Sequence, residues 1–186
     1  MNRLRPVLGA LCLSLGALVA TSALAATDAT PFGAFQSICL TPNADFATVK
    51  AAVASWRDTE VTGDTTLPGV TVSDKLTKAS KTGGIPVTLF AWTGTTKSGV
   101  HVSGCTLRVS KPDFDELQGA ATAYAGFAAQ DASPKKAVFH YTSASGKLTA
   151  LDKSGFEAAA SGEGMDILTV SSDIHGSVVD LLKIKK

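Results

Sequence analysis

Three segments between residues 70 and 109 constrain the fold of this chain more than any other feature. Strand-like composition and alternation run over 70–78, 85–93 and 100–109. The connections at 80–84 and 94–99 are short and consist of Gly, Ser, Thr and Lys residues. Antiparallel strands can be joined by such short connections, whereas parallel strands need a crossover of about a dozen or more residues. The sequence therefore predicts an antiparallel unit of three strands.

A helix is predicted ahead of these strands, over residues 43–56, after a loose leading segment at 26–34. The start signals are Pro42, Asn43 and Asp45. The apolar residues that recur at helical intervals are Phe46, Val49, Val53 and Trp56. A second helix is predicted from Pro112, with acidic residues in its first turn and an apolar stripe that ends before Gly126.

The second half of the chain carries further strand signals. Segments 136–143, 147–151 and 166–172 are expected to be strands, and 152–164 is expected to form a loop, with a helical turn around 156–160 as the alternative. The segment 177–184 fits a strand by alternation, but its apolar spacing also fits a helix, so periodicity leaves the choice open.

These elements predict an α+β domain with the order α-β-β-β-α-β-β-β. About six strands form an antiparallel sheet, and two helices pack on one of its faces. The two halves have a similar order of elements, although no repeat is visible at the level of residues.

The first 25 residues have the order of a secretory signal peptide. Arg3 and Arg5 precede an apolar run over 7–20, and Ala23 and Ala25 are small residues placed for a signal peptidase. An uncleaved membrane anchor is the alternative, but glycine and hydroxyl residues dilute the run. No second hydrophobic span follows. We therefore expect cleavage after Ala25, a single domain over 26–186 without a membrane span, and a periplasmic or secreted location.

Size and charge narrow the function classes. Removal of residues 1–25 from the 186 leaves 161, which suits one domain with its own hydrophobic core. Without Arg3 and Arg5 the 17 basic residues become 15 against 16 acidic ones, a formal net charge of −1. Because the lysines are scattered, no basic stripe marks a nucleic-acid surface. Nucleic acid is not an expected partner.

Two cysteines, Cys39 and Cys105, remain after Cys12 leaves with the signal peptide. An even number in an oxidising compartment predicts a disulfide, which would place the first helix near the sheet face that carries Cys105. The alternatives are a redox pair or a metal site. A redox motif needs cysteines two residues apart, and zinc needs more ligands than Cys105 and His101 supply. We expect neither a metal nor another cofactor.

Much of the chain after the signal peptide resembles a class of known proteins. The residues that carry the resemblance are Phe35 and Cys39 at a spacing of four, Trp56, and the run 105–109 (Cys-Thr-Leu-Arg-Val) ahead of an acidic helix. In these features the chain resembles small exported proteins of Gram-negative bacteria without an assigned activity. The resemblance implies secretion and a paired-cysteine framework, and it implies no catalytic residues.

No common catalytic motif accompanies the three histidines His101, His140 and His175. The sequence contains no zinc-protease helix motif, no Gly-x-Ser-x-Gly elbow and no phosphate-binding loop. His101 or His140 could act as a general base beside a carboxylate such as Asp166 or Asp173, because catalytic groups can assemble from distant segments.

Aromatic residues offer the remaining candidates for ligand contact. Trp56 is expected in the core, and Trp92, which shares a strand face with Phe90, is expected to be the more exposed. Possible ligand contacts are thus Trp92, His101 and His140. We expect a non-catalytic exported domain that binds a protein or an envelope component through a sheet face or edge. The alternative is a small exported hydrolase with a dispersed active site that contains a histidine.

Overall fold

A computed structural model of the protein describes residues 30–60, 68–110, 114–161 and 164–185. The expected signal peptide and its cleavage site lie outside these ranges, so both stay predictions.

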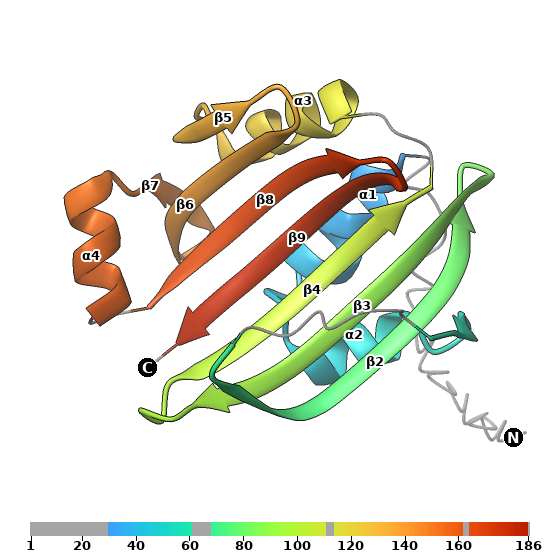
Figure 1. Cartoon of the computed structure of the whole chain (residues 1–186), viewed down its shortest axis with the longest axis horizontal. Coiled ribbons are helices and arrows are strands. Elements are labelled where there is room, and N and C mark those ends of the chain that lie inside the picture. Colours follow the sequence, from blue (N-terminus) through green and yellow to red (C-terminus); the bar gives the residue numbers. More distant parts are fainter. Residues whose placement is uncertain (1–29, 61–67, 111–113, 162–163, 186) are drawn as a thin grey trace, which may run out of the picture.

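The described residues form an α+β structure built on one antiparallel open sheet, which confirms the predicted class (Figure 1). The strands are β1 (Arg57–Asp58), β2 (Val70–Thr82), β3 (Ile85–Thr96), β4 (His101–Val109), β5 (Asp131–Ser133), β6 (Lys136–Ala144), β7 (Lys147–Ala150), β8 (Met165–Asp173) and β9 (Gly176–Lys185). Their order across the sheet is β1-β2-β3-β4-β9-β8-β6-β5, and β7 also pairs with β6.

Nine strands are present among the described residues, against about six predicted. Two of the additional strands, β1 and β5, are two and three residues long and carry little periodicity. The third, β9, covers the segment that periodicity left open between strand and helix. The open choice over 177–184 is decided as a strand, because β9 pairs along its length with both β4 and β8. Tertiary pairing overrides a local pattern that also fits a helix.

Helices differ more from the prediction. The α-helices are α1 (Pro31–Phe35), α2 (Phe46–Ala52), α3 (Phe114–Ala125) and α4 (Lys153–Ser161), and η1 (Gln36–Leu40) is a π-helical turn. The expected loose segment at 26–34 thus ends in a helix, and α4 replaces the expected loop. The first predicted helix begins at Phe46, where the Asp45 carboxylate caps the Thr48 N–H at 2.9 Å, and it ends at Ala52.

The two halves of the sheet share one plan. Strands β2, β3 and β4 form one antiparallel meander after α1 and α2, and β6, β8 and β9 form another after α3. The last strand of each meander, β4 and β9, pair in the middle of the sheet. The last strand of each meander is therefore central in the sheet and is paired on both sides.

One face of the sheet, here called the inner face, holds the main core. Leu89, Leu107, Leu168, Phe139 and Leu181 point into it and are essentially inaccessible to solvent. Helices α1 and α2 lie behind the sheet in Figure 1, and α3 packs on β8. Burying such side chains contributes about 1.5–3 kcal/mol each and drives the layered arrangement.

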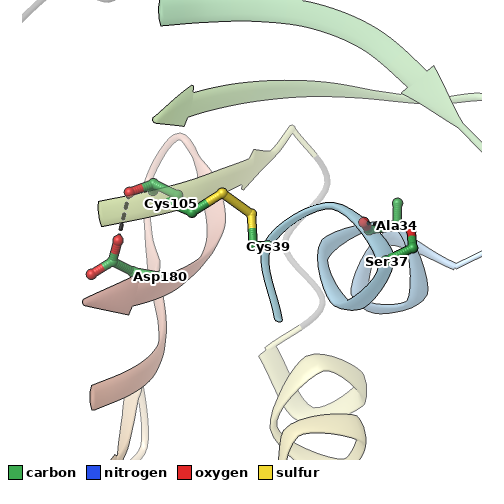
Figure 2. Close-up of a disulfide and its surroundings, with 6 residues drawn as sticks. Ala34, Ser37, Cys39, Cys105 and Asp180 are labelled. Atoms are coloured by element: carbon green, nitrogen blue, oxygen red, sulfur yellow. Dashed lines mark hydrogen bonds between the residues drawn. A yellow bond between two sulfur atoms is a disulfide. The ribbon is translucent and has the colours of Figure 1, made fainter. Parts of the chain in front are cut away.

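A disulfide joins η1 to β4 on this inner face, which confirms the predicted pairing. Cys39 and Cys105 are both fully buried, and their Cα atoms lie 5.8 Å apart (Figure 2). The bond closes a loop of 66 residues, for which the chain-entropy model gives about 4 kcal/mol of stabilisation. Helix α2, the counterpart of the predicted first helix, also lies on this face as expected, because it contacts β3 and its Val49 belongs to the main core.

The opposite face, here called the outer face, carries a smaller apolar cluster of Phe90, Trp92 and Val102. Helix α4 also contacts this side: Phe156 packs edge-on against His140, with ring centroids 4.8 Å apart, while the neighbours Phe139 and Tyr141 point into the core. The expectation that the helices share one face is therefore wrong for α4.

Candidate functional site

A buried ion pair on the inner face, near the C-terminal end of the chain, is the main polar feature of the core. Lys183 of β9 donates from Nζ to Asp166 Oδ1 of β8 at 2.7 Å, and these side chains are 8% and 4% exposed. Lys183 also donates to Asn43 Oδ1 at 2.7 Å. The register pairs Asp166 with Lys183 directly across the two strands. The ammonium and carboxylate groups thus compensate each other in a site from which water is largely removed.

The turn that supplies Asn43 has an unusual backbone. Asn43 and the next residue, Ala44, have φ angles of 59° and 52°. Left-handed conformations cost L-residues with a side chain roughly 1–2 kcal/mol each, and Asn tolerates them better than Ala. Ala44 is held by its N–H, which donates to Cys39 O at 2.8 Å, and by burial. The turn thus brings the Asn43 amide to Lys183.

A hollow of about 250 Å³, here called hollow 1, lies beside the ion pair. Its wall combines hydroxyl, amide and carboxylate groups with leucine side chains. The residues that line hollow 1 are Leu40, Thr41, Asn43, Tyr124, Tyr141, Ser143, Gly146, Leu148, Asp166 and Leu181. They come from η1 and the turn after it, α3, the β6–β7 hairpin, β8 and β9.

Two phenols, those of Tyr124 and Tyr141, form part of this wall. Burial, followed by the nearby Asp166 charge, raises the pKa of Tyr124; burial also raises the pKa of Tyr141, strongly. The interaction between the two phenols lowers the pKa of Tyr124 and raises that of Tyr141. Both phenols stay neutral at physiological pH.

A second hollow, hollow 2, shares Asn43 with hollow 1 as a lining residue and has a volume of about 290 Å³. It is the more charged of the two. The residues that line hollow 2 are Asn43, Ala44, Asp45, Phe46, Thr93, His101, Val102, Ser103, Lys183 and Lys185. Hydrogen bonds from Thr48 and the positive charge of Lys185 lower the pKa of Asp45, so its carboxylate is ionised. The Asn43–Lys183 contact thus lies where the two hollows meet.

The structure places the three predicted contact residues in different environments. His101 is exposed and lines hollow 2. His140 packs against Phe156, and burial followed by the positive charge of Lys136 lowers its pKa, against an opposing effect of Asp131. The three residues do not come together in one site, because His101 lines hollow 2, His140 packs against α4, and Trp92 belongs to an outer-face cluster that does not include His140.

Trp92 is only 3% exposed, so the expectation that it is a more exposed residue is wrong. Gly104 on the neighbouring strand leaves room for the indole, because a Cβ at that position would overlap the Trp92 ring. Val70 and Val72 of β2 pack against the same cluster. A glycine opposite a tryptophan is the physical reason for this burial, and period two alone does not reveal it.

The carboxylates considered as partners of a histidine are engaged elsewhere. Asp166 pairs with Lys183, and Asp173 accepts from Arg108 at 3.2 Å and from the His175 backbone N–H at 2.7 Å. The Asp173 hydrogen bonds are the main reason that its pKa is lowered. The hydrogen bonds described for His140 and His175 involve their backbone N–H and C=O groups and not their imidazole rings.

One end of the sheet is closed against further strands. Strand β6 pairs with β5 at one end of its outer edge and with β7 at the other. Between them, the Gln130 side chain donates to His140 O at 2.9 Å and accepts from His140 N at 3.0 Å, in the manner of a strand. Such cover blocks the recruitment of another chain.

At the other end of the sheet, β2 pairs with β1 near Lys78 and has a register shift between Val72 and Asp74. Lysine residues and irregularities of this kind discourage pairing between edges. Both ends of the sheet therefore favour a binding surface elsewhere than at the edge.

Within the part of the chain that the structure describes, no group of three or more histidine, cysteine, aspartate or glutamate residues is arranged to hold a metal ion. None of the helices in the same ranges is long and apolar enough to cross a membrane.

Sequence reasoning did not select the residues of the ion pair as a site. In the sequence analysis Asp166 is only a possible partner of a histidine, Asn43 is only a helix start signal, and Lys183 is not considered. A signal does exist, because the period of two puts Asp166 on the same face of β8 as the buried Leu168, and Lys183 on the same face of β9 as the buried Leu181. Charged residues of opposite sign at core positions of adjacent strands indicate a buried pair.

Comparison with protein-family models, curated proteins and solved structures finds no match to this chain. The resemblance to small exported proteins of Gram-negative bacteria is therefore supported only in its paired-cysteine framework, which the Cys39–Cys105 disulfide bears out.

Proposed function

We propose that this protein is an exported, non-catalytic domain that binds a protein or an envelope component through the surface around Asn43, Lys183 and Asp166. The observation that carries the proposal is the buried ion pair beside two hollows. Desolvating two charges costs several kcal/mol per ion, and apolar residues of similar volume are often neutral or better for stability. A buried pair next to a turn with two left-handed residues supports a role in recognition.

Export is supported by the disulfide, because such bonds persist in oxidising compartments and are rare in the cytosol. The N-terminal order of basic, apolar and small residues supports the same route. A periplasmic or secreted location is therefore part of the proposal. It places envelope proteins and polysaccharides among the accessible partners.

The test uses the protein purified after export and an envelope fraction from the native host. Glycine tolerates the positive φ of residue 43, so Asn43→Gly keeps the turn but removes the amide oxygen that accepts from Lys183. We expect this variant to lower retention on that fraction by about tenfold, the value of one hydrogen bond to a charged group. Ser145→Gly is the matched control, because Ser145 also has a positive φ, 51°, and lines neither hollow. Equal retention of both variants, or none by the parent protein, would refute the proposal.

The alternative, a small hydrolase, has one location that favours it. Hollow 2 contains His101 together with Ser103 and the ionised Asp45. A histidine with a hydroxyl and a carboxylate is the set that acyl transfer uses. Turnover of ester or peptide substrates that is lost in both His101→Gln and Ser103→Ala would replace the binding proposal with this one.

A further inference from the structure

We infer that hollow 1 binds a single neutral saccharide ring, so that the envelope component is a glycan. The inference rests on the proposed binding function and names its ligand class. It is carried by a lining that combines hydrogen-bonding side chains with leucine side chains, and whose carboxylate is compensated by Lys183.

The polar groups of hollow 1 match the hydrogen-bonding pattern of a sugar. Thr41, Ser143 and Tyr124 carry hydroxyls that donate and accept, and the Asn43 amide does both with separate atoms. A ligand that is rich in hydroxyls satisfies such a wall, whereas a purely apolar ligand would leave its groups unpaired.

The charge balance of hollow 1 favours a neutral ligand. Its only carboxylate, Asp166, is compensated by Lys183 at 2.7 Å, and the phenols of Tyr124 and Tyr141 are held neutral by raised pKa values. An ionic ligand would meet no uncompensated opposite charge. Hollow 2 differs in this respect, because Lys185 and Asp45 add charges there.

The volume of hollow 1 and the leucine side chains in its lining favour a single sugar ring as the ligand. Its volume of about 250 Å³ lies just below the range of about 300–1,000 Å³ that is typical of sites for drug-sized ligands. Leu40, Leu148 and Leu181 provide apolar surface for the C–H groups of a ring. The exposed residues Ser143 and Gly146 form the rim, so the rest of a glycan would extend into solvent.

The experiment titrates the exported protein with glucose, galactose, N-acetylglucosamine and oligomers of N-acetylglucosamine, and follows backbone amide signals by NMR. We expect at least one of these sugars to shift signals of hollow 1 residues with millimolar affinity. Tyr124→Phe should weaken binding about tenfold and Ser143→Ala about fivefold, the values of single hydrogen bonds. The matched control is Thr142→Ala, because Thr142 precedes Ser143 on β6 and points to the outer face.

The result separates the ligand class from the binding function. If no sugar shifts hollow 1 signals, or if the Tyr124 and Ser143 variants bind like the parent protein, the saccharide inference is wrong. If, in addition, Asn43→Gly still lowers retention on the envelope fraction, the binding function stands. Loss of retention after protease treatment of that fraction identifies a protein partner and also overturns the saccharide inference.

Discussion

Replacing Lys183 with Met tests the energetics of the buried pair directly. Methionine keeps most of the length and apolar stem of lysine, so packing changes little, but the ammonium is removed. Asp166, whose side chain is 4% exposed, then loses its partner at 2.7 Å. Breaking a buried pair by removing one member costs about 3–5 kcal/mol, because an uncompensated charge stays buried. We expect Lys183→Met to lose that amount of unfolding free energy.

The double variant Lys183→Met, Asp166→Leu distinguishes this explanation from a loss of packing. Apolar replacement of both ions removes the desolvation penalty together with the attraction, and such changes are often neutral or stabilising by about 1–4 kcal/mol. We therefore expect the double variant to be at least as stable as the parent protein. The coupling energy from the double-mutant cycle should amount to several kcal/mol.

Urea unfolding followed by tryptophan fluorescence measures both effects, with unchanged m-values as the check for two-state behaviour. The control is Asp173→Asn, which breaks the Arg108 pair, whose side chains are 45% and 47% exposed. That change should cost no more than about 1 kcal/mol. A cost below about 1 kcal/mol for Lys183→Met, equal to that of the exposed pair, would refute the reasoning. The double variant should also lose envelope retention while it keeps its stability.

Three further outcomes are expected from the same unfolding assay. Cys39→Ala with Cys105→Ala should lower the unfolding free energy by about 2–5 kcal/mol, and unchanged stability would contradict a structural role. Gly104→Ala should cost about 1–3 kcal/mol and alter the fluorescence of Trp92, because the added methyl overlaps the indole. Burial raises the pKa of Asp180, against a hydrogen bond that lowers it. The folded protein thus holds this proton more tightly than the unfolded chain does, and stability falls as pH rises above 3.8 towards the raised pKa. Asp180→Asn should therefore stabilise at neutral pH, and its advantage should disappear below pH 3.8; an equal effect at both pH values would contradict this cause.

Local patterns predict a large part of the fold. The antiparallel unit over 70–109 follows from alternation and short turns, and α3 follows from its apolar stripe. The segment Pro31–Leu40 was missed because helices this short are marginal by themselves. Burial of Phe32 and Phe35 and the bond from Cys39 hold it in place.

Much less of the candidate site could be predicted. Asp166 and Lys183 are 17 residues apart, and Asn43 is 140 residues from Lys183. No local pattern connects such positions. Their meeting depends on the register of β8 with β9 and on the left-handed turn that follows η1.

The sequence by itself determined the α+β class, the cysteine pair, the absence of common catalytic motifs and the N-terminal features that predict export, because each depends on composition or short-range spacing. The tertiary structure decided that 177–184 is a strand, that Trp92 is buried, and that Lys183 meets Asp166 beside two hollows. Strand pairing between distant segments sets which side chains leave water together. Which side chains are buried together therefore depends on the whole fold and not on any one segment of the chain.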